Sequence, residues 1–147
     1  MDKCDARNTL TESKIIVTKQ RLLLMQSVLE FGCPFSASEI HANNMQISDL
    51  ATVYRFFKLL QENSIIRSVA QMNDTQYYEL ACKHNPNHPH FLCKSCHKLS
   101  CLEAIKSSDL FRLAQYTPQQ EVDDVCVIYT GTCNNCIKNN LGVTNDE

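Results

Sequence analysis

Two pairs of cysteines restrict the possible folds of this chain more than any other feature. Each pair has two residues between its members: Cys93 with Cys96, and Cys133 with Cys136. That gap lets both sulfur atoms of a pair face one point, and two such pairs can complete a tetrahedron of thiolates around zinc. Four thiolates leave no open position, so the spacing predicts a structural zinc site. The ion would join both ends of the 36-residue segment between the pairs.

The number of cysteines indicates the redox context. The chain has 9 cysteines in 147 residues, and an odd number argues against a closed disulfide framework. The N-terminal segment lacks the apolar core of a signal peptide, and no apolar run approaches the ~18 residues that cross a bilayer. We therefore expect a cytoplasmic protein without a membrane partner, whose reduced thiols bind metal. A thiol oxidoreductase that uses one cysteine pair is the alternative, although the βαβ context of thioredoxin is missing.

The order of the expected elements in the first half is that of a winged helix. After a loose segment over residues 1–10, we expect a short helix around 10–16 and a helix from the Thr18 cap to Gly32. The capping box of Ser36 and Glu39 predicts a further short helix, and Ser48 is the expected cap of a helix over 49–63. Two strands over 64–71 and 75–80 should follow, with their turn at Asn73 and Asp74. Because the net charge is only −2, a DNA-binding face would have to be local.

The second half predicts a small α/β domain. We expect a strand, a knuckle and a strand over 91–103, a helix over 103–117, and a strand that runs into the second knuckle over 121–136. The predicted fold class is therefore α+β. Its expected parts are a winged-helix domain over 1–82, a hinge over 83–90, a metal-binding domain over 91–140, and a loose tail over 141–147. Paired carboxylates, a nucleophile elbow and a phosphate loop are missing, so we expect neither an enzyme nor a small-molecule substrate.

The hinge carries a second candidate metal site. His88 and His90 alternate in an extended segment, so their side chains project to the same side. Cys82 lies six residues before His88 and adds a thiolate, and Glu103 or Cys101 is a candidate fourth ligand. A metal at the junction of two domains could lock their relative orientation, which is the action of a sensor.

Four segments occur in an order that resembles the ferric uptake regulator superfamily of bacterial transcription factors. They are Thr18-Lys19-Gln20-Arg21, Thr52-Val53-Tyr54-Arg55, the stretch from His88 to Cys96, and the stretch from Ile128 to Cys136. The resemblance covers roughly residues 10–138. It implies an N-terminal winged-helix domain, a C-terminal dimerisation domain, and a homodimer that binds AT-rich inverted repeats when its regulatory metal is bound, usually as a repressor.

The resemblance also implies roles for individual residues. The four paired cysteines match the structural zinc site of the family, and His88 and His90 match ligands of its regulatory site. Tyr54 and Arg55 match the DNA-contacting end of the recognition helix, where Arg55 can contact a phosphate or a guanine edge. The full set of expected DNA-contacting residues is Lys14, Lys19, Arg21, Thr52, Tyr54 and Arg55.

The identity of the regulatory metal follows from the thiolate. The pattern Cys82-x5-His88-x-His90 resembles the zinc-sensing branch of the superfamily, and a soft thiolate with two imidazoles favours zinc over ferrous iron or manganese. An iron- or peroxide-responsive regulator, with iron or manganese at this site, is the alternative. The chain departs from the family pattern at His97, where glycine is common, and at Cys101, where a carboxylate is often found.

Overall fold

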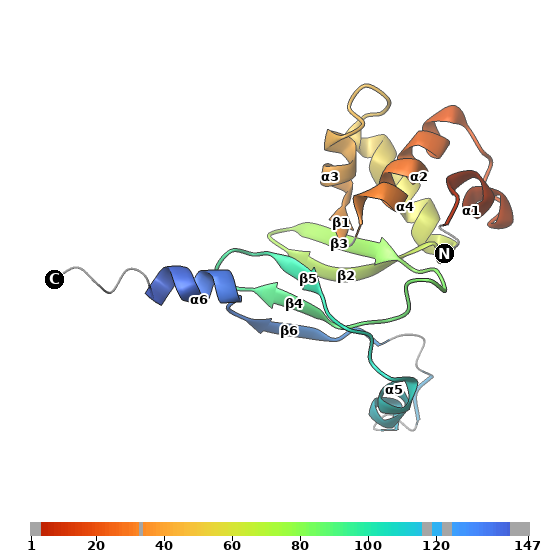
Figure 1. The fold of residues 1–147 in the computed structure, drawn as a ribbon. Coiled ribbons are helices and arrows are strands. Elements are labelled where there is room, and N and C mark those ends of the chain that lie inside the picture. The colour runs from red at the N-terminus through yellow and green to blue at the C-terminus, as the bar shows by residue number, and fades with distance from the viewer. Residues whose placement is uncertain (1–3, 33, 116–118, 122–124, 142–147) are drawn as a thin grey trace. The chain divides into compact units, whose positions relative to one another are not determined.

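The chain divides into two compact units after Asn85 (Figure 1). The computed structural model describes residues 4–32, 34–115, 119–121 and 125–141. The first unit comprises residues 1–85 and the second comprises residues 86–147, and the division falls inside the predicted hinge. Both units combine helices with a sheet, and the predicted α+β fold class is confirmed.

The first unit is a winged helix, in which four helices accompany a three-stranded antiparallel sheet (Figure 1). Its elements are α1 (Ala6–Glu12), α2 (Lys19–Phe31), β1 (Phe35–Ser36), α3 (Ala37–Ala42), α4 (Leu50–Glu62), β2 (Ile66–Met72) and β3 (Thr75–Leu80). The strand order is β1-β3-β2. Asn73 and Asp74 both have positive φ, at 46° and 62°, as a tight two-residue hairpin turn requires.

Local capping explains where α2 and α3 begin. The Thr18 hydroxyl accepts a hydrogen bond from the Arg21 backbone N–H, and Gly32 ends α2 with a φ of 87°. At α3, the Ser36 hydroxyl accepts from the Glu39 backbone N–H while the Glu39 carboxylate accepts from the Ser36 backbone N–H. The capping positions predicted for these two helices are confirmed.

Two other predictions of helix boundaries are wrong. The first helix was expected around residues 10–16 after a loose segment, whereas α1 occupies Ala6–Glu12 because the Asp5 side chain accepts from the Asn8 backbone N–H. Ser48 was expected to cap the third long helix, but Asp49 does so, and its carboxylate accepts from the Thr52 backbone N–H at 2.7 Å. Aspartate caps as well as serine does, so sequence alone did not separate adjacent candidates.

The core of the first unit places α4 against the sheet. Its fully buried apolar side chains come from helices and hairpin alike: Leu10, Leu24, Met25, Val28, Phe35, Ile40, Val53, Phe57, Leu60 and Ile66. The Phe57 ring makes edge contacts with Phe35, at 5.7 Å between centroids, and with Tyr78, at 5.3 Å. Since this face of α4 is buried, the opposite face, with Tyr54 and Arg55, is exposed.

The second unit is built on a mixed sheet with strand order β5-β4-β6. Its elements are β4 (His90–Cys93), β5 (Leu99–Cys101), α5 (Ser107–Ala114), β6 (Ile128–Gly131) and α6 (Asn134–Leu141). Strand β4 pairs antiparallel with β5 and parallel with β6. The helix predicted over 103–117 begins only at Ser107. Residues 116 and 117 of that predicted helix lie outside the described part of the chain. The same is true of residues 122–124 of the strand predicted over 121–136. Strand β1 and helix α6 were not predicted.

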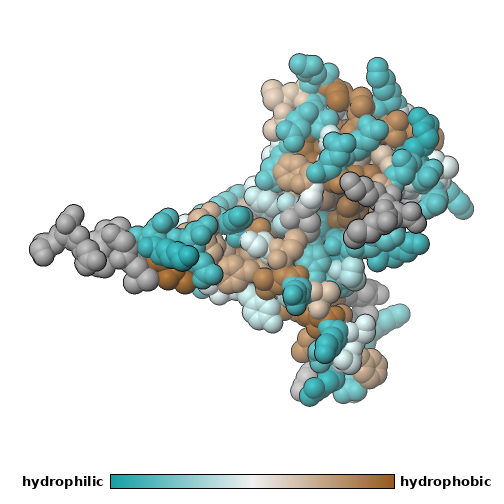
Figure 2. All heavy atoms as spheres, in the orientation of Figure 1, coloured by the Kyte–Doolittle hydropathy of each residue, from teal (hydrophilic) through white to brown (hydrophobic). Residues whose placement is uncertain are grey.

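Apolar side chains in the second unit are mostly at its surface. Every fully buried leucine, isoleucine, valine, phenylalanine or methionine of the described ranges belongs to the first unit. The large exposed apolar residues of the second unit are Leu102, Phe111, Leu113, Ile128, Tyr129 and Ile137. Figure 2 shows apolar surface beside the hydrophilic side chains of α6. This unit therefore has little hydrophobic core of its own.

Among the helices of the described residues, we find none with the length and apolar character that crossing a bilayer requires.

Candidate metal centres and nucleic-acid face

The sheet of the second unit brings the two cysteine pairs together. Cys93 is the last residue of β4 and pairs in register with Gly131, the last residue of β6. Each strand runs directly into a cysteine pair, so parallel pairing puts both pairs at the same edge of the sheet. The Lys94 backbone N–H donates to the Gly131 carbonyl at 2.8 Å and continues the alignment past the strand ends.

The four sulfur atoms have the spacing of a tetrahedral metal site. The Sγ atoms of Cys93, Cys96, Cys133 and Cys136 all lie within 4.8 Å of one another. Cys93 Sγ lies 3.9 Å from Cys136 Sγ, and Cys96 Sγ lies 3.9 Å from Cys133 Sγ. A tetrahedron with metal–sulfur bonds of about 2.3 Å has edges of about 3.8 Å. The residues present therefore fit a bound tetrahedral ion.

Two thiols of the four-cysteine group have shifted pKa values. Backbone N–H groups, first of Cys96 and then of Cys133, lower the pKa of the Cys93 thiol to about 6. The Cys133 backbone N–H lies 3.3 Å from Cys93 Sγ. A hydrogen bond with the Cys133 thiol, followed by burial, raises the pKa of Cys136 to about 12. The lowered pKa favours the Cys93 thiolate at neutral pH, and Cys136 releases its proton when a cation binds.

The first knuckle contains a left-handed residue where this chain has no glycine. His97 follows the Cys93–Cys96 pair and has a φ of 59°. Its backbone N–H donates to the Cys93 carbonyl at 2.9 Å, which closes the turn around the first pair. Glycine adopts this conformation without the steric cost that a Cβ atom imposes. The positive φ of His97 therefore gives a physical reason to expect glycine at this position.

A second group in this unit combines two histidines with a cysteine. His90 is the first residue of β4 and is the cross-strand partner of Cys101 in β5. Their side chains are therefore neighbours on the same face of the sheet. The His88 and His90 rings lie 4.6 Å apart between centroids. One ligand atom each from His88, His90 and Cys101 lies within 4.8 Å of the others. His90 is almost fully buried, whereas Cys101 is exposed.

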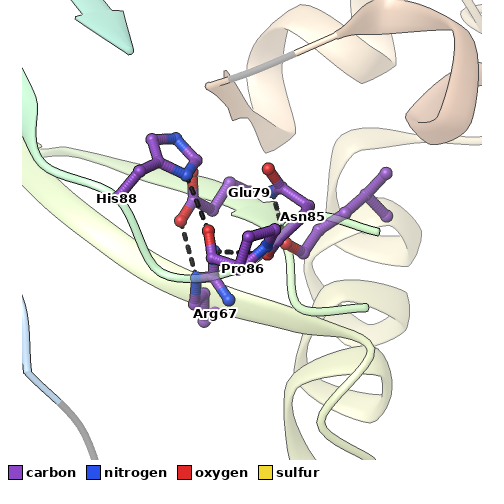
Figure 3. A network of polar contacts seen from close by, with 6 residues as sticks. Arg67, Glu79, Asn85, Pro86 and His88 are labelled. Carbon is purple, nitrogen blue, oxygen red and sulfur yellow. Dashed lines mark hydrogen bonds and ion pairs between the residues drawn. The ribbon is translucent and has the colours of Figure 1, made fainter. Parts of the chain in front are cut away.

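A backbone carbonyl fixes the orientation of the His88 ring. The Nδ1 atom of His88 lies 2.9 Å from the Pro86 carbonyl oxygen (Figure 3). A carbonyl can only accept, so Nδ1 carries the proton and donates it to this hydrogen bond. The Nε2 atom is then the ring nitrogen with a lone pair, and such a backbone contact is typical of a metal-binding histidine.

The other predicted ligands of the hinge site, Glu103 and Cys82, have their own surroundings within their units. Glu103 is exposed in the segment after β5 and does not join the group formed by the two histidines and Cys101. Cys82 belongs to the first unit, where its ligand atom lies within 4.8 Å of those of Cys4 and His84. Spacing could not have linked Cys4 to this group, because most of the first unit separates it from Cys82 in the sequence.

Five of the six predicted DNA-contacting residues lie on α2 and α4. Arg21, Thr52 and Arg55 line one pocket of about 330 Å³ together with Gln20. The Arg55 guanidinium donates to the Thr52 hydroxyl at 3.1 Å, and that of Arg21 donates to the Ile16 carbonyl at 3.0 Å. Two guanidinium groups around one pocket form a local cationic site on a chain with a net charge of −2.

The remaining members of the predicted face are exposed but do not line this pocket. Tyr54 is 50% exposed on α4. Lys19 opens α2, and Lys14 lies in the turn after α1 with a φ of 57°. A cationic pocket and an exposed aromatic ring on one helix are able to contact phosphates and base edges.

Together, the two units define a winged-helix protein whose second unit carries two groups of metal-ligating side chains. Residues 12–121, which are well over half of the chain, match the model of the Ferric uptake regulator family. This chain belongs to the ferric uptake regulator family.

Individual relatives agree with this assignment. The Ferric uptake regulation protein of Campylobacter jejuni is 29% identical over 98 residues, which are 63% of this chain and 61% of that relative. This chain thus spans about three fifths of the length of the curated relatives it matches. Among solved structures, the Helicobacter pylori ferric uptake regulator Fur has a TM-score of 0.69 and 19% identity, and the similarity covers 89% of this chain and 88% of that one.

A zinc uptake regulator in complex with zinc and DNA has the same fold. Its TM-score is 0.59 and its identity 21%, over 92% of this chain and 93% of that one. At these identities the two solved structures establish the fold shared with this chain.

Proposed function

We propose that this chain is a metal-dependent transcriptional repressor that binds AT-rich inverted repeats of operator DNA as a homodimer in the cytoplasm, and that zinc is the metal it senses. The observation that carries the proposal is that the second unit holds the group of His88, His90 and Cys101 in addition to the four-cysteine cluster. Two separate groups allow one ion to stabilise the unit while another reports metal availability.

The ligand types support zinc at both places. Four thiolates with tetrahedral spacing favour a structural zinc ion. The soft Cys101 thiolate, together with two imidazoles, favours zinc over ferrous iron or manganese. The sequence predicts Cys82 as the thiolate ligand and Glu103 or Cys101 as a further ligand. The short distances among ligand atoms of His88, His90 and Cys101 support Cys101 in that set. An oxidoreductase is disfavoured, because all four paired cysteines converge on one point.

DNA binding is supported by the cationic pocket of Arg21 and Arg55 and by the exposed Tyr54. A winged helix presents one recognition helix, so an inverted repeat requires two copies related by a two-fold axis. Exposed apolar residues of the second unit, among them Phe111 and Tyr129, offer a surface that a second copy could bury.

The sensing site is tested by following DNA binding at controlled concentrations of free metal. A duplex selected from a random pool by the zinc-loaded chain serves as the probe, and fluorescence anisotropy gives its affinity with zinc, manganese and ferrous iron. We expect His90→Ala and Cys101→Ser to lose zinc-dependent binding while they keep the four-cysteine zinc. Glu103→Gln, the matched control from the same strand–loop region, should respond like the wild type.

Other results of this titration would change either the metal or the thiolate ligand that we assign to the sensing site. A response to ferrous iron or manganese in preference to zinc would make the chain an iron- or manganese-dependent member of the same family. A normal zinc response in Cys101→Ser, together with a lost response in Cys82→Ser, would return the sensing thiolate to Cys82.

The DNA face is tested separately with the same duplex. Arg55→Ala should weaken binding by about 1–3 kcal/mol, or about 5- to 150-fold, if the guanidinium contacts a base. Arg112→Ala, an exposed arginine of α5 in the other unit, is the control and should leave the affinity unchanged. Equal affinities for Arg55→Ala and the wild type would remove Arg55 from the interface.

A further inference from the structure

The first unit contains a third group of metal-ligating side chains, outside both groups in the second unit. One ligand atom each from Cys4, Cys82 and His84 lies within 4.8 Å of the others. The three side chains line the same open pocket, together with the acidic residues Asp5 and Glu30. All of these residues belong to residues 1–85, so the group lies entirely within the winged-helix unit. We propose that Cys4, Cys82 and His84 form a zinc-binding site that clamps the first segment of the winged helix to its last.

The measured separation between two members of the group fits a shared metal ion. Cys4 Sγ lies 3.5 Å from His84 Nδ1. In a tetrahedral zinc site with a sulfur bond of about 2.3 Å and a nitrogen bond of about 2.05 Å, the sulfur and nitrogen atoms are about 3.6 Å apart. Two thiolates with one imidazole form a soft ligand set that selects zinc over magnesium, calcium or manganese. Three protein ligands leave the fourth position to water.

Both ends of the group are anchored to ordered structure. Cys4 directly precedes Asp5, whose side chain accepts from the Asn8 backbone N–H at 2.9 Å and caps α1. Helix α1 in turn buries Ala6 and Leu10 in the core of the unit. Cys4 is therefore placed by a capped and packed helix, although it lies close to the start of the chain.

The turn that carries the other two ligands is fixed at its far end. The Asn85 backbone N–H donates to the Cys82 carbonyl at 2.9 Å, and the Asn85 side chain donates to the Leu80 carbonyl at 2.7 Å. The Arg67 guanidinium donates to the Asn85 carbonyl at 2.9 Å and is itself bound by Glu79 at 2.6 Å (Figure 3). His84 lies inside this turn, so the ligands are largely preorganised, as a specific metal site requires.

Zinc at this site would couple metal to the stability of the winged helix. The ion would cross-link Cys4 to Cys82 and close a loop of chain that runs through nearly the whole first unit. An ion that binds only the folded unit stabilises that unit. Since one position remains open to solvent and His84 is exposed, this zinc should be removed by a chelator before the zinc of the four-cysteine cluster. The proposal is independent of the regulatory function proposed above.

The test measures zinc per chain in the full-length reduced protein after equilibration with zinc alone at defined free concentrations. We expect Cys4→Ser, Cys82→Ser and His84→Asn each to bind one zinc fewer than the wild type. Cys126→Ser replaces a cysteine outside all three groups and should keep the wild-type content. His90→Ala reports the proposed sensing site separately, so Cys82→Ser combined with His90→Ala should lose two ions.

A second measurement uses the wild type and therefore needs no variant to fold. Peptide mapping after alkylation should show that zinc slows the modification of Cys4 and that a chelator restores it. Unchanged zinc content in Cys4→Ser, with equal alkylation of Cys4 in the presence and absence of zinc, would overturn the site. So would a Cys4–Cys82 disulfide that persists in reducing buffer and excludes zinc. Loss of a single ion in Cys82→Ser combined with His90→Ala would assign Cys82 to the sensing site instead.

Discussion

Replacing Cys133 with serine should unfold the second unit and leave the first unit folded. Cys133 directly precedes α6, and its Sγ lies 3.9 Å from the Sγ of Cys96 in the other cysteine pair. Serine is nearly isosteric but is a poor zinc ligand, so the change removes one of four ligands with little effect on packing. The rest of the unit must then be stable without the ion.

The magnitude follows from how little apolar surface this unit buries. A fully buried leucine, isoleucine, valine, phenylalanine or methionine contributes about 1.5–3 kcal/mol. Within residues 86–115, 119–121 and 125–141 the structure shows none. A structural zinc ion contributes about 10–16 kcal/mol, whereas the net stability of a whole domain is about 5–15 kcal/mol. Zinc therefore outweighs the hydrophobic contribution here, and its loss should leave no stable fold in this unit.

Hydrogen exchange followed by mass spectrometry can resolve the two units in one experiment. In Cys133→Ser we expect lost protection over β4, β5 and β6, unchanged protection over α2 and α4, and loss of the four-cysteine zinc. Cys126→Ser should keep wild-type exchange and wild-type zinc content. The reasoning is refuted if the Cys133→Ser protein lacks this zinc and yet protects β4–β6 as the wild type does.

Three further outcomes follow from individual contacts. Arg67→Met removes a partner that binds the buried Glu79 carboxylate at 2.6 Å, and urea denaturation should show a loss of about 1.5–3 kcal/mol in the first unit; an unchanged midpoint would contradict this. His97→Gly relieves a φ of 59° and should stabilise the knuckle by about 1 kcal/mol, seen as slower zinc loss to a chelator; faster loss would exclude strain at this residue. Hydrogen bonds from Thr52 lower the pKa of Asp49 in the folded protein below its usual 3.8. The ionised Asp49 cap therefore stabilises the folded protein above pH 3.8, and this stabilisation is lost as the pH falls through the lowered pKa of the folded state. The advantage of the wild type over Asp49→Ala in urea midpoint should therefore shrink on acidification, and an advantage that is independent of pH would contradict the assignment.

Much of the architecture could be predicted from the sequence, because the signals are local. The caps at Thr18 and Ser36, and the turn at Asn73 and Asp74, act through residues within four positions of one another, so their spacing in the sequence is their spacing in space. The same holds within each cysteine pair. The start of α1 was missed because Asp5 caps it from a segment that has no hydrophobic periodicity.

The tertiary structure decided which distant residues share a site. Parallel pairing of β4 with β6 joins the cysteine pairs, and the register of β4 with β5 sets Cys101, and not Glu103, beside the histidines. The packing of α1 against the core brings Cys4 to Cys82 and His84. A ligand set needs side chains a few ångströms apart. Sequence spacing determines this separation within a turn, whereas strand register and helix packing determine it between segments far apart in the chain.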